Sequence, residues 1–330
     1  MPNYNGVWSL TTKLQYNTDW EADNVPPVFA LFAGGNLSSG DTNAIQRVNL
    51  TSSGNGIDFA DLSQAKDDGA TGGNTTRFIY AGGSGSSNNL LEIDYLSYSS
   101  GGTAADFGDM TIGREGMNGA MASSTRTVFG PGLTSASYPS NYGNVIDYIT
   151  TSSTGNATDF GDHTIGVNRP SFLSSSTRGV IGGGLNSDAD LQNVMAYIEI
   201  GTTGNATDFG DLSVARSNLT SFASSTRGCF AGGAIQGGDS NTIDYITISS
   251  TGNASDFGDL SAGAGEALGA ASDATTGLIA GGQFDGGSSR NNNIQNVTIA
   301  STGNTTDFGD LIAEVREIRG YSSAAPAVQG

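Results

Sequence analysis

The chain alternates between short apolar runs and polar, glycine-rich turns. In one representative stretch, an apolar run at residues 179–183 ends in glycines, and an alternating apolar and polar segment follows at 193–200. A turn-rich segment at 203–207 then leads to a short run at 208–212 and to a small, polar run with spaced apolar residues at 215–223. Period-two alternation and short runs bounded by turn residues are typical of β-strands. The pattern therefore predicts four short strands per stretch.

This stretch is one of six internal repeats. Its most regular mark is the motif Asp-Phe-(Gly/Ala)-Asp, at residues 58–61, 106–109, 159–162, 208–211, 256–259 and 307–310, with successive spacings of 48, 53, 49, 48 and 51 residues. A four-stranded sheet of about 50 residues cannot bury both of its faces alone, so such repeats pack face to face around an axis. The sequence therefore predicts an all-β fold, a six-bladed β-propeller over residues 28–330.

The phase of the repeats predicts how the ring closes. Residues 28–62 supply three strands of a blade, but no innermost strand precedes them. The stretch 319–326 aligns with an innermost strand and has no further strand after it. We therefore expect the N-terminal and C-terminal strands to complete one blade together, which removes the open sheet edges that invite aggregation.

The repeats resemble the kelch repeat. Kelch units have an arginine that opens the innermost strand, a Gly-Gly doublet after the second strand, and a tyrosine in the third. Arg114 and Arg216 match the arginine, and the doublet is seen at 34–35, 82–83, 182–183, 232–233 and 281–282. The third-strand tyrosines are Tyr95, Tyr148, Tyr197 and Tyr245. The chain departs from kelch because phenylalanine stands where kelch has tryptophan, so we describe it as kelch-like and carry over no kelch partner.

Composition and charge exclude several classes of function. Fifty glycines and 14% charged residues fit a β-rich chain with many turns. The formal net charge of −19 repels phosphate backbones, so we expect no nucleic-acid partner. One cysteine and one histidine can form neither an internal disulfide nor a conventional zinc site. The apolar runs are shorter than a bilayer span needs, so we expect no membrane insertion.

The candidates for chemistry favour a protein that is not an enzyme and has no cofactor. The paired aspartates of the repeats are hard oxygen ligands of the kind that Ca²⁺ uses, but we favour their use as acceptors for turn N–H groups and expect no metal. His163 stands where other repeats have leucine or methionine, and Cys229 aligns with core positions. A Ser-His-Asp triad has no second histidine to draw on. Two converging carboxylates of a glycosidase remain an alternative.

The first 27 residues differ from the repeats and are expected to form an aromatic docking strap. Trp8, Tyr16 and Trp20 lie there, and aromatic residues of this kind anchor protein interfaces. The alternative is a strap packed on its own propeller. The start Gly6-Val7-Trp8-Ser9-Leu10, with the later repeats, resembles small appendage and tail-fibre-type virion proteins of tailed phages, especially marine cyanophages. This resemblance implies a virion location and other virion proteins as partners.

The loop between the second and third strands varies most among the repeats. These loops comprise residues 36–43, 84–89, 133–143, 185–192, 234–240 and 283–292, and we expect them on one face of the propeller. Loops on a rigid scaffold commonly carry binding specificity. The third loop holds Tyr138 and Tyr142, which can stack on a sugar or fill a pocket of a partner, so we assign them as binding residues.

These observations leave three hypotheses of function. The first is a phage virion structural protein without enzymatic activity, a tail- or fibre-associated propeller for assembly or for binding a glycan or protein of the host surface. The second is a glycan-binding or glycan-degrading propeller enzyme, and the third is a cellular kelch-like adaptor. Because one fold serves many functions, the preference for the first rests on the resemblance.

Overall fold

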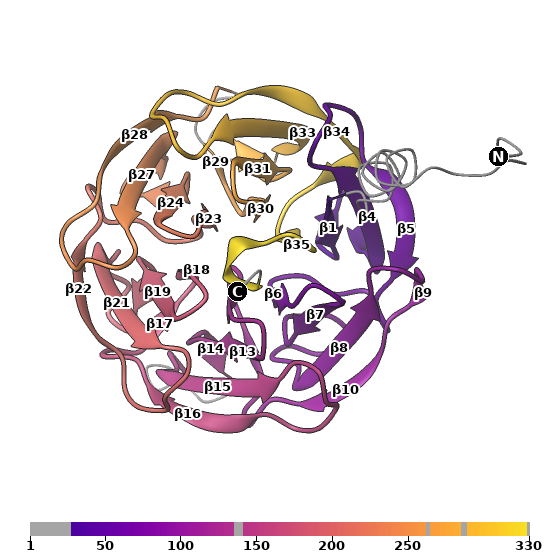
Figure 1. Cartoon of the computed structure of the whole chain (residues 1–330), viewed down its shortest axis with the longest axis horizontal. Helices are drawn as coiled ribbons and strands as arrows, with labels where there is room; N and C mark the ends of the chain where they lie inside the picture. Colours follow the sequence, from indigo (N-terminus) through magenta and orange to yellow (C-terminus); the bar gives the residue numbers. More distant parts are fainter. Residues whose placement is uncertain (1–27, 135–140, 262–264, 285–288, 329–330) are drawn as a thin grey trace, which may run out of the picture.

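The computed structural model is an all-β ring of six sheets around a central axis (Figure 1). It describes residues 28–134, 141–261, 265–284 and 289–328. The predicted six-bladed β-propeller of four-stranded blades is therefore confirmed. No helix within these described ranges is long and apolar enough to cross a membrane.

Each blade is an antiparallel sheet whose four principal strands run from the axis to the rim. Blades 1 to 3 are β35 (Arg319–Ser322), β1 (Phe29–Ala33), β4 (Ala44–Asn49) and β5 (Ile57–Asp61); β6 (Ala70–Gly73), β7 (Arg77–Ala81), β8 (Glu92–Ser97) and β10 (Ala105–Asp109); and β12 (Met121–Ala122), β13 (Arg126–Phe129), β15 (Val145–Thr150) and β16 (Thr158–Asp162). Blades 4 to 6 are β18 (Ser171–Ser174), β19 (Arg178–Gly182), β21 (Val194–Glu199) and β22 (Thr207–Asp211); β23 (Thr220–Ala223), β24 (Arg227–Ala231), β27 (Thr242–Thr247) and β28 (Ser255–Asp259); and β30 (Gly269–Ser272), β31 (Thr276–Ala280), β33 (Ser289–Thr298) and β34 (Thr306–Val315).

The ring closes in blade 1 as the repeat phase predicts. β35 pairs antiparallel with β1, from Ala30 opposite Ser322 to Ala33 opposite Arg319. The innermost strand of this blade thus comes from the C-terminal part of the chain, while its other three principal strands come from the N-terminal part (Figure 1).

A repeated stack of three side chains ties the second, third and fourth strands together. In four blades an arginine lies over a tyrosine ring, 4.4–4.9 Å from guanidinium carbon to ring centroid, and the tyrosine meets a phenylalanine edge-on with centroids 5.8–6.2 Å apart. These stacks are Arg77, Tyr95 and Phe107; Arg126, Tyr148 and Phe160; Arg178, Tyr197 and Phe209; and Arg227, Tyr245 and Phe257. Each arginine also donates to a backbone carbonyl of the next blade. The third-strand tyrosines therefore stabilise contacts within and between blades.

The Asp-Phe-Gly-Asp motif forms the outer strand and receives a turn from the next blade. In blade 3 a β-bulge at Phe160 separates the pairs Ile146–Gly161 and Asp147–Asp159, and Phe160 is buried. The side chain of Asn205, in the next blade, accepts a hydrogen bond from the Asp162 backbone N–H at 3.0 Å. Gly161 must be glycine, because a Cβ would lie 2.5 Å from the backbone of Gly204. The asparagine of the Thr-Gly-Asn turn thus joins neighbouring blades.

The first motif, at residues 58–61, has Ala60 in the place of this glycine. Ala60 faces a connection that reads Gly101-Gly102-Thr103 in place of Thr-Gly-Asn. This segment forms β9 (Gly102–Thr103), which pairs parallel with β5 through Ala60 and Asp61. Ala60 does not have a positive φ, whereas Gly161 at the same motif position has a φ of 146°, so alanine fits.

Three blades contain a buried ion pair between the segment that enters the blade and its third strand. The pairs are Lys66 with Asp94, Arg114 with Asp147 and Arg216 with Asp244, at 2.9, 3.0 and 2.7 Å. Arg114 and Arg216 thus lie ahead of the innermost strands β12 and β23 rather than at their first residues. Blade 4 carries Val167 and Ala196 at the equivalent positions. The two charged residues are therefore present together or absent together. This is expected, because removing one partner of a buried ion pair lowers the stability of the fold by about 3–5 kcal/mol.

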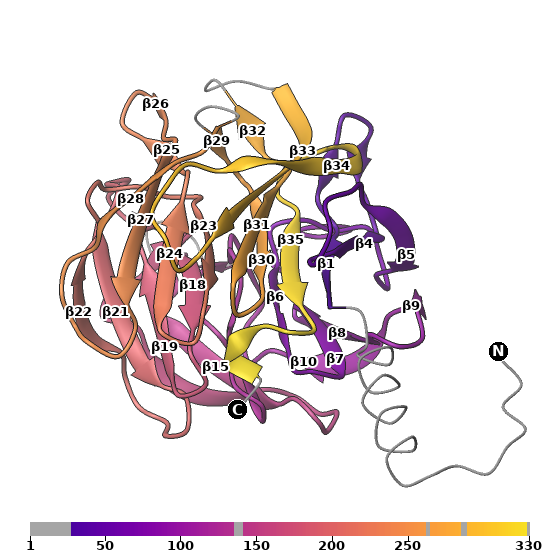
Figure 2. The ribbon, with the colours of Figure 1, turned by 45° about the horizontal axis from the view of Figure 1, so that its top comes forward.

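The two faces of the ring differ in what they carry. The start of β1, at Phe29, and the last turn η1 (Pro326–Val328) lie at the end of the blades where the second strands begin: the Ser323 N–H, shortly before η1, donates to the Phe29 carbonyl at 3.2 Å. Figure 2 shows the C-terminal end of the chain on this side. The loops between second and third strands all emerge at the opposite end, as predicted, and we call that side the loop face. Each blade has four antiparallel strands in the same order from axis to rim. Connections of the same kind therefore lie at the same end of every blade.

Candidate functional site

The loop face is built from short hairpins and from the segments that enter each blade. β2 (Asn36–Leu37) pairs with β3 (Gly40–Asp41), and β25 (Ala234–Ile235) pairs with β26 (Gly238–Asp239). In blades 3, 4 and 6 the loop pairs with the entering segment: β14 (Leu133–Thr134) with β11 (Arg114–Glu115), β20 (Leu185–Asn186) with β17 (Val167–Asn168), and β32 (Gln283–Phe284) with β29 (Gly265–Glu266). The variable loops are therefore attached to the scaffold.

A ring of six residues with left-handed backbone surrounds the axis on this face. They are Asp68, Gly116, Arg169, Asn218, Ala267 and Glu317, with φ between 51° and 69°. Five backbone hydrogen bonds join neighbours, from the N–H of one ring residue to the carbonyl of the preceding one, at 2.8–3.1 Å. Five of the six are not glycine, and that conformation is costly for other residues, so the surrounding contacts must hold it.

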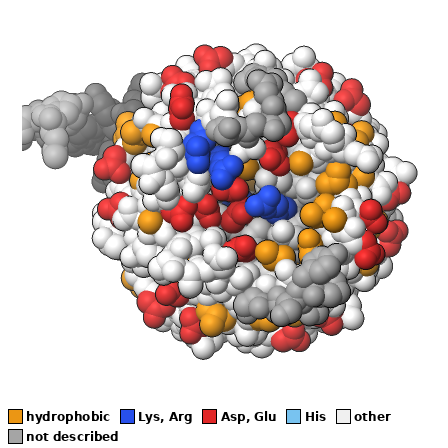
Figure 3. All heavy atoms as spheres, turned by 180° about the vertical axis from the view of Figure 1, so that it is seen from behind, with side chains coloured by type: hydrophobic (Ala, Val, Ile, Leu, Met, Phe, Trp, Pro, Cys, Tyr) orange, Lys and Arg blue, Asp and Glu red, His pale blue; other side chains and the backbone are white. Residues whose placement is uncertain are grey.

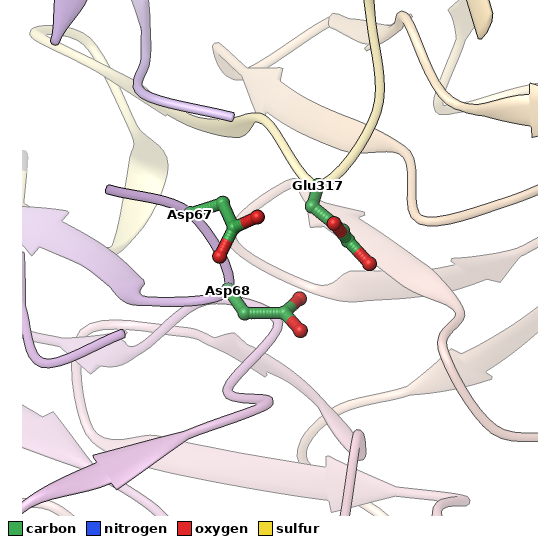
Figure 4. Close-up of side chains that lie close together, drawn as sticks. All are labelled: Asp67, Asp68 and Glu317. Carbon is green, nitrogen blue, oxygen red and sulfur yellow. The ribbon is translucent and has the colours of Figure 1, made fainter. Parts of the chain in front are cut away.

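Three carboxyl groups meet where this ring joins its two ends. Side-chain oxygens of Asp67, Asp68 and Glu317 lie within 4.8 Å of one another, and each residue is no more than 8% exposed (Figure 4). Arg319 lies 2.7 Å from Asp68, and Arg169 lies 3.2 Å from Asp68 and 3.7 Å from Glu317. In the space-filling view of this face, red acidic groups adjoin blue cationic ones near the centre (Figure 3).

Burial and mutual repulsion raise the pKa of two carboxyl groups in this cluster, those of Asp67 and Glu317. Burial raises the pKa of Asp67, and the negative charges of Asp68 and Glu317 raise it further. Burial also raises the pKa of Glu317, with a further contribution from Asp68. Within the described ranges this is the group of three acidic side chains close enough to share a cation, but guanidinium groups already face it. The arrangement is that of an internal ion-pair network.

Arg319 connects this cluster to three blades. Its Nε donates to the backbone carbonyls of Gly69 and Met117 at 3.1 and 3.2 Å, and its NH2 donates to Asp68 and Asn118 at 2.7 and 2.6 Å. Asn118 in turn donates to the Leu219 carbonyl at 3.0 Å. The network therefore closes the loop-face end of the axis and holds the C-terminal strand in place.

The predicted site residues have different outcomes. Tyr142 lies on the loop face, half-buried, and its backbone forms a bridge with Leu133. Tyr138 lies outside the described residues, as do the docking residues Trp8, Tyr16 and Trp20. Those four assignments stay predictions.

Sequence reasoning missed the axial cluster. Lys66-Asp67-Asp68 occupies the entry segment where another repeat reads Arg114-Glu115-Gly116, and Arg316-Glu317 occupies it in blade 1. Alignment of these entry segments would have shown charged residues at axial positions. It would not have shown that Asp67 and Glu317 meet, because their blades become neighbours only when the ring closes.

The single histidine and cysteine are both core residues. His163 is 4% exposed, its Nδ1 lies 2.9 Å from the Ile165 carbonyl, and its buried Nε2 has no hydrogen-bond partner in the described structure. Burial lowers its pKa. Cys229 is fully buried, and burial raises the pKa of its thiol to about 12. Neither side chain has the exposure or the partner of a nucleophile or general base.

Replacing His163 with leucine, the residue of several other repeats, is expected to stabilise the protein. The change removes a buried nitrogen without a partner, which costs about 1–3 kcal/mol. A base whose pKa is lower in the folded chain loses stability as the pH falls below its unfolded value of about 6.5. The gain in urea unfolding should therefore be larger at pH 5 than at pH 8. Leu212→His, the reciprocal change directly after the outer strand of blade 4, should destabilise. An equal gain from His163→Leu at both pH values would contradict the prediction.

The comparisons with known proteins add no family. No protein-family model matches the chain, and a search of the curated proteins finds no match. The class that fold and site define is a six-bladed β-propeller with an internally neutralised axis and a loop-bearing face.

Proposed function

We propose that the chain is a non-enzymatic binding propeller of a tailed-phage virion, placed in a tail or fibre assembly, and that its loop face contacts the host surface. The observation that carries this proposal is the polarity of the ring: residues 1–27 precede β1, and β1 begins on the face opposite the variable loops. A segment that docks to other virion proteins there leaves the loop face free to meet a target.

Three further observations support a binding role. The buried ion pairs and the axial network use charged residues to hold the blades together. The loops between second and third strands differ most among the repeats in length and sequence. The only histidine and the only cysteine of the chain are core residues. The virion location rests on the resemblance of the Gly6–Leu10 opening and the repeats to appendage and tail-fibre-type proteins.

Particle composition tests the location. Mass spectrometry of particles purified from the phage that encodes the chain should find its peptides in the virion. Absence from particles, with the protein present in infected cells, would contradict the proposal. The same purified protein should leave host polysaccharide intact, since turnover would favour the glycan-degrading alternative.

Removing residues 1–25 is expected to separate docking from folding. The truncated chain should keep its melting temperature, because Val28 onward supplies all four strands of every blade, and it should no longer enter particles. Tyr142→Ala in the intact chain is the matched control, which should enter particles normally. Global unfolding of the truncated chain would show that the segment belongs to the core.

A further inference from the structure

We propose that one proton, shared by the carboxyl groups of Asp67 and Glu317, closes the ring on the loop face, and that its loss at alkaline pH loosens the junction between blades 1 and 2. We call these two groups the closing pair. Asp67 lies in the segment that enters blade 2, and Glu317 lies in the segment that enters blade 1. The inference concerns the closure of the ring, so it goes beyond the proposed function and does not depend on the virion role.

The ring of left-handed residues is incomplete where the closing pair lies. Its five backbone hydrogen bonds run from Asp68 around the axis to Glu317, whose N–H donates to the Ala267 carbonyl at 2.8 Å. Among the described residues, no sixth backbone hydrogen bond joins Asp68 to Glu317. Side chains must therefore connect the two ends of the ring at this position.

The contact within the closing pair requires a proton. The carboxyl groups of Asp67 and Glu317 are hydrogen-bonded to each other, and both residues are buried (Figure 4). An ionised carboxylate only accepts hydrogen bonds, so two ionised groups cannot form this bond. One of the two must be protonated, and it then donates a charge-assisted hydrogen bond to the other.

The nearby cations place this proton on Asp67. Arg169 lies 3.7 Å from Glu317, and Arg316 lies 3.5 Å from it. Arg319 pairs with Asp68. Within the described ranges Asp67 forms no ion pair with any of these cations. Glu317 therefore keeps its negative charge and accepts, and Asp67 donates.

Burial and nearby negative charges hold the proton in place. Burial contributes most to the raised pKa of Asp67, followed by the charges of Asp68, Glu317 and Asp41. The other charged and titratable groups that face the closing pair are Tyr80, Arg169, Arg316 and Arg319, while the neighbouring Lys66 pairs with Asp94. Asp67 thus keeps its proton at a pH at which an exposed aspartate has lost it.

The closing pair is attached to two of the variable loops. Asp67 exchanges two backbone hydrogen bonds with Ser84, at 2.8 and 2.9 Å, and Ser84 begins the loop of blade 2. Arg316, next to Glu317, exchanges two with Asn36, at 2.8 and 3.2 Å, and Asn36 begins the loop of blade 1. Repulsion between two ionised groups here would act on both loops.

The sign of the pH effect follows from the difference between the folded and unfolded chains. Unfolded Asp67 loses its proton above a pH of about 4, whereas the folded chain keeps it to a higher pH. Deprotonation therefore favours the unfolded chain. While the folded chain holds this extra proton, each unit of pH lowers the folding equilibrium constant by up to tenfold.

Urea unfolding of Asp67→Asn at several pH values tests the inference. The amide of asparagine donates to Glu317 as a protonated carboxyl group does, but it does not titrate. The ratio of the folding equilibrium constant of Asp67→Asn to that of the unmodified chain should rise at least tenfold from pH 6 to pH 8. His163 and Cys229 are present in both chains, so their titration cancels from this ratio.

A matched control and a direct measurement of the proton complete the test. Asp188→Asn removes the same charge from an exposed position of the loop face, and its ratio should stay constant over this pH range. Infrared spectra of the folded chain at pH 7 should show the carbonyl band of a protonated carboxyl group, and Asp67→Asn should remove that band.

A ratio for Asp67→Asn that stays constant with pH, or an infrared band that this variant leaves unchanged, overturns the inference. If Asp67→Asn fails to fold, Glu317→Gln replaces it, because the glutamine amide can donate to ionised Asp67 and its ratio should also rise with pH. These results are independent of particle composition. Failure here leaves the proposed function standing, and absence of the protein from particles leaves this inference standing.

Discussion

Deleting residues 319–330 is expected to lower the melting temperature by about 10 °C or more, or to leave a chain that aggregates. The deletion removes β35, the innermost strand of blade 1, and exposes the paired edge of β1. It also removes Arg319, which binds Asp68 and the carbonyls of Gly69 and Met117. Open strand edges promote association between chains. Thermal unfolding with light scattering measures both effects, and an unchanged transition would contradict the closure of the ring by this strand.

A point substitution sharpens this test. Arg319→Leu keeps the strand but leaves Asp67, Asp68 and Glu317 with one fewer buried cation, so a loss of about 3–5 kcal/mol is expected in urea unfolding. Arg316→Leu is the matched control, because its side chain is one-third exposed and its ion pair with Glu317 is long, at 3.5 Å. That change should cost less than about 1 kcal/mol. Equal losses for the two variants would show that the axial network does not hold the ring.

The second large effect is expected in blade 5. Asp244→Ala leaves the fully buried Arg216 guanidinium without its carboxylate partner, so we expect a loss of about 3–5 kcal/mol. Arg216→Val with Asp244→Ala copies the Val167 and Ala196 of blade 4, and this double variant should regain most of that loss. Replacing a buried pair by apolar residues is often neutral or stabilising.

A double-mutant cycle in urea measures the coupling. The single variant Arg216→Val should also destabilise, because Asp244 then keeps only the hydrogen bonds from Ser213. If the double variant is less stable than either single variant, the two charged residues are not exchanged as a pair among the blades, and the prediction is wrong. Double substitution at Arg114 and Asp147 in blade 3 gives an independent repeat of the measurement.

The residues that hold the blades together are separate from the loops that we propose to bind a target. Ion pairs, stacks and the axial network hold the blades in register, and they lie on inner strands, blade interfaces and the axis. The β2–β3 and β25–β26 hairpins of the loop face lie outside these contacts, so substitutions there are expected to change binding more than stability. The proposed recognition face can therefore vary without loss of the ring.

The sequence by itself determined the architecture. The six Asp-Phe-(Gly/Ala)-Asp motifs predicted six blades, and the missing innermost strand before residue 28 predicted closure by residues 319–326; the structure confirms both. These features are local: strand alternation, turn residues and a repeat length that fits one four-stranded sheet. Core positions of His163 and Cys229 followed from the same alignment, since equivalent residues occupy equivalent places in a ring.

Only the tertiary structure decided where chemically distinct groups meet. The Gly-Gly doublet of blade 4 is structurally Gly183-Gly184, one residue later than the sequence alignment placed it, because these are the two glycines with positive φ after β19. Asp68 contacts Glu317 and Arg319 from the opposite end of the chain, and Asn89 contacts Glu115 across a blade boundary. Repeat periodicity specifies each blade, but the rotation from one blade to the next sets which side chains converge on the axis and the loop face. That rotation results from packing between sheets, which no local pattern in the sequence records.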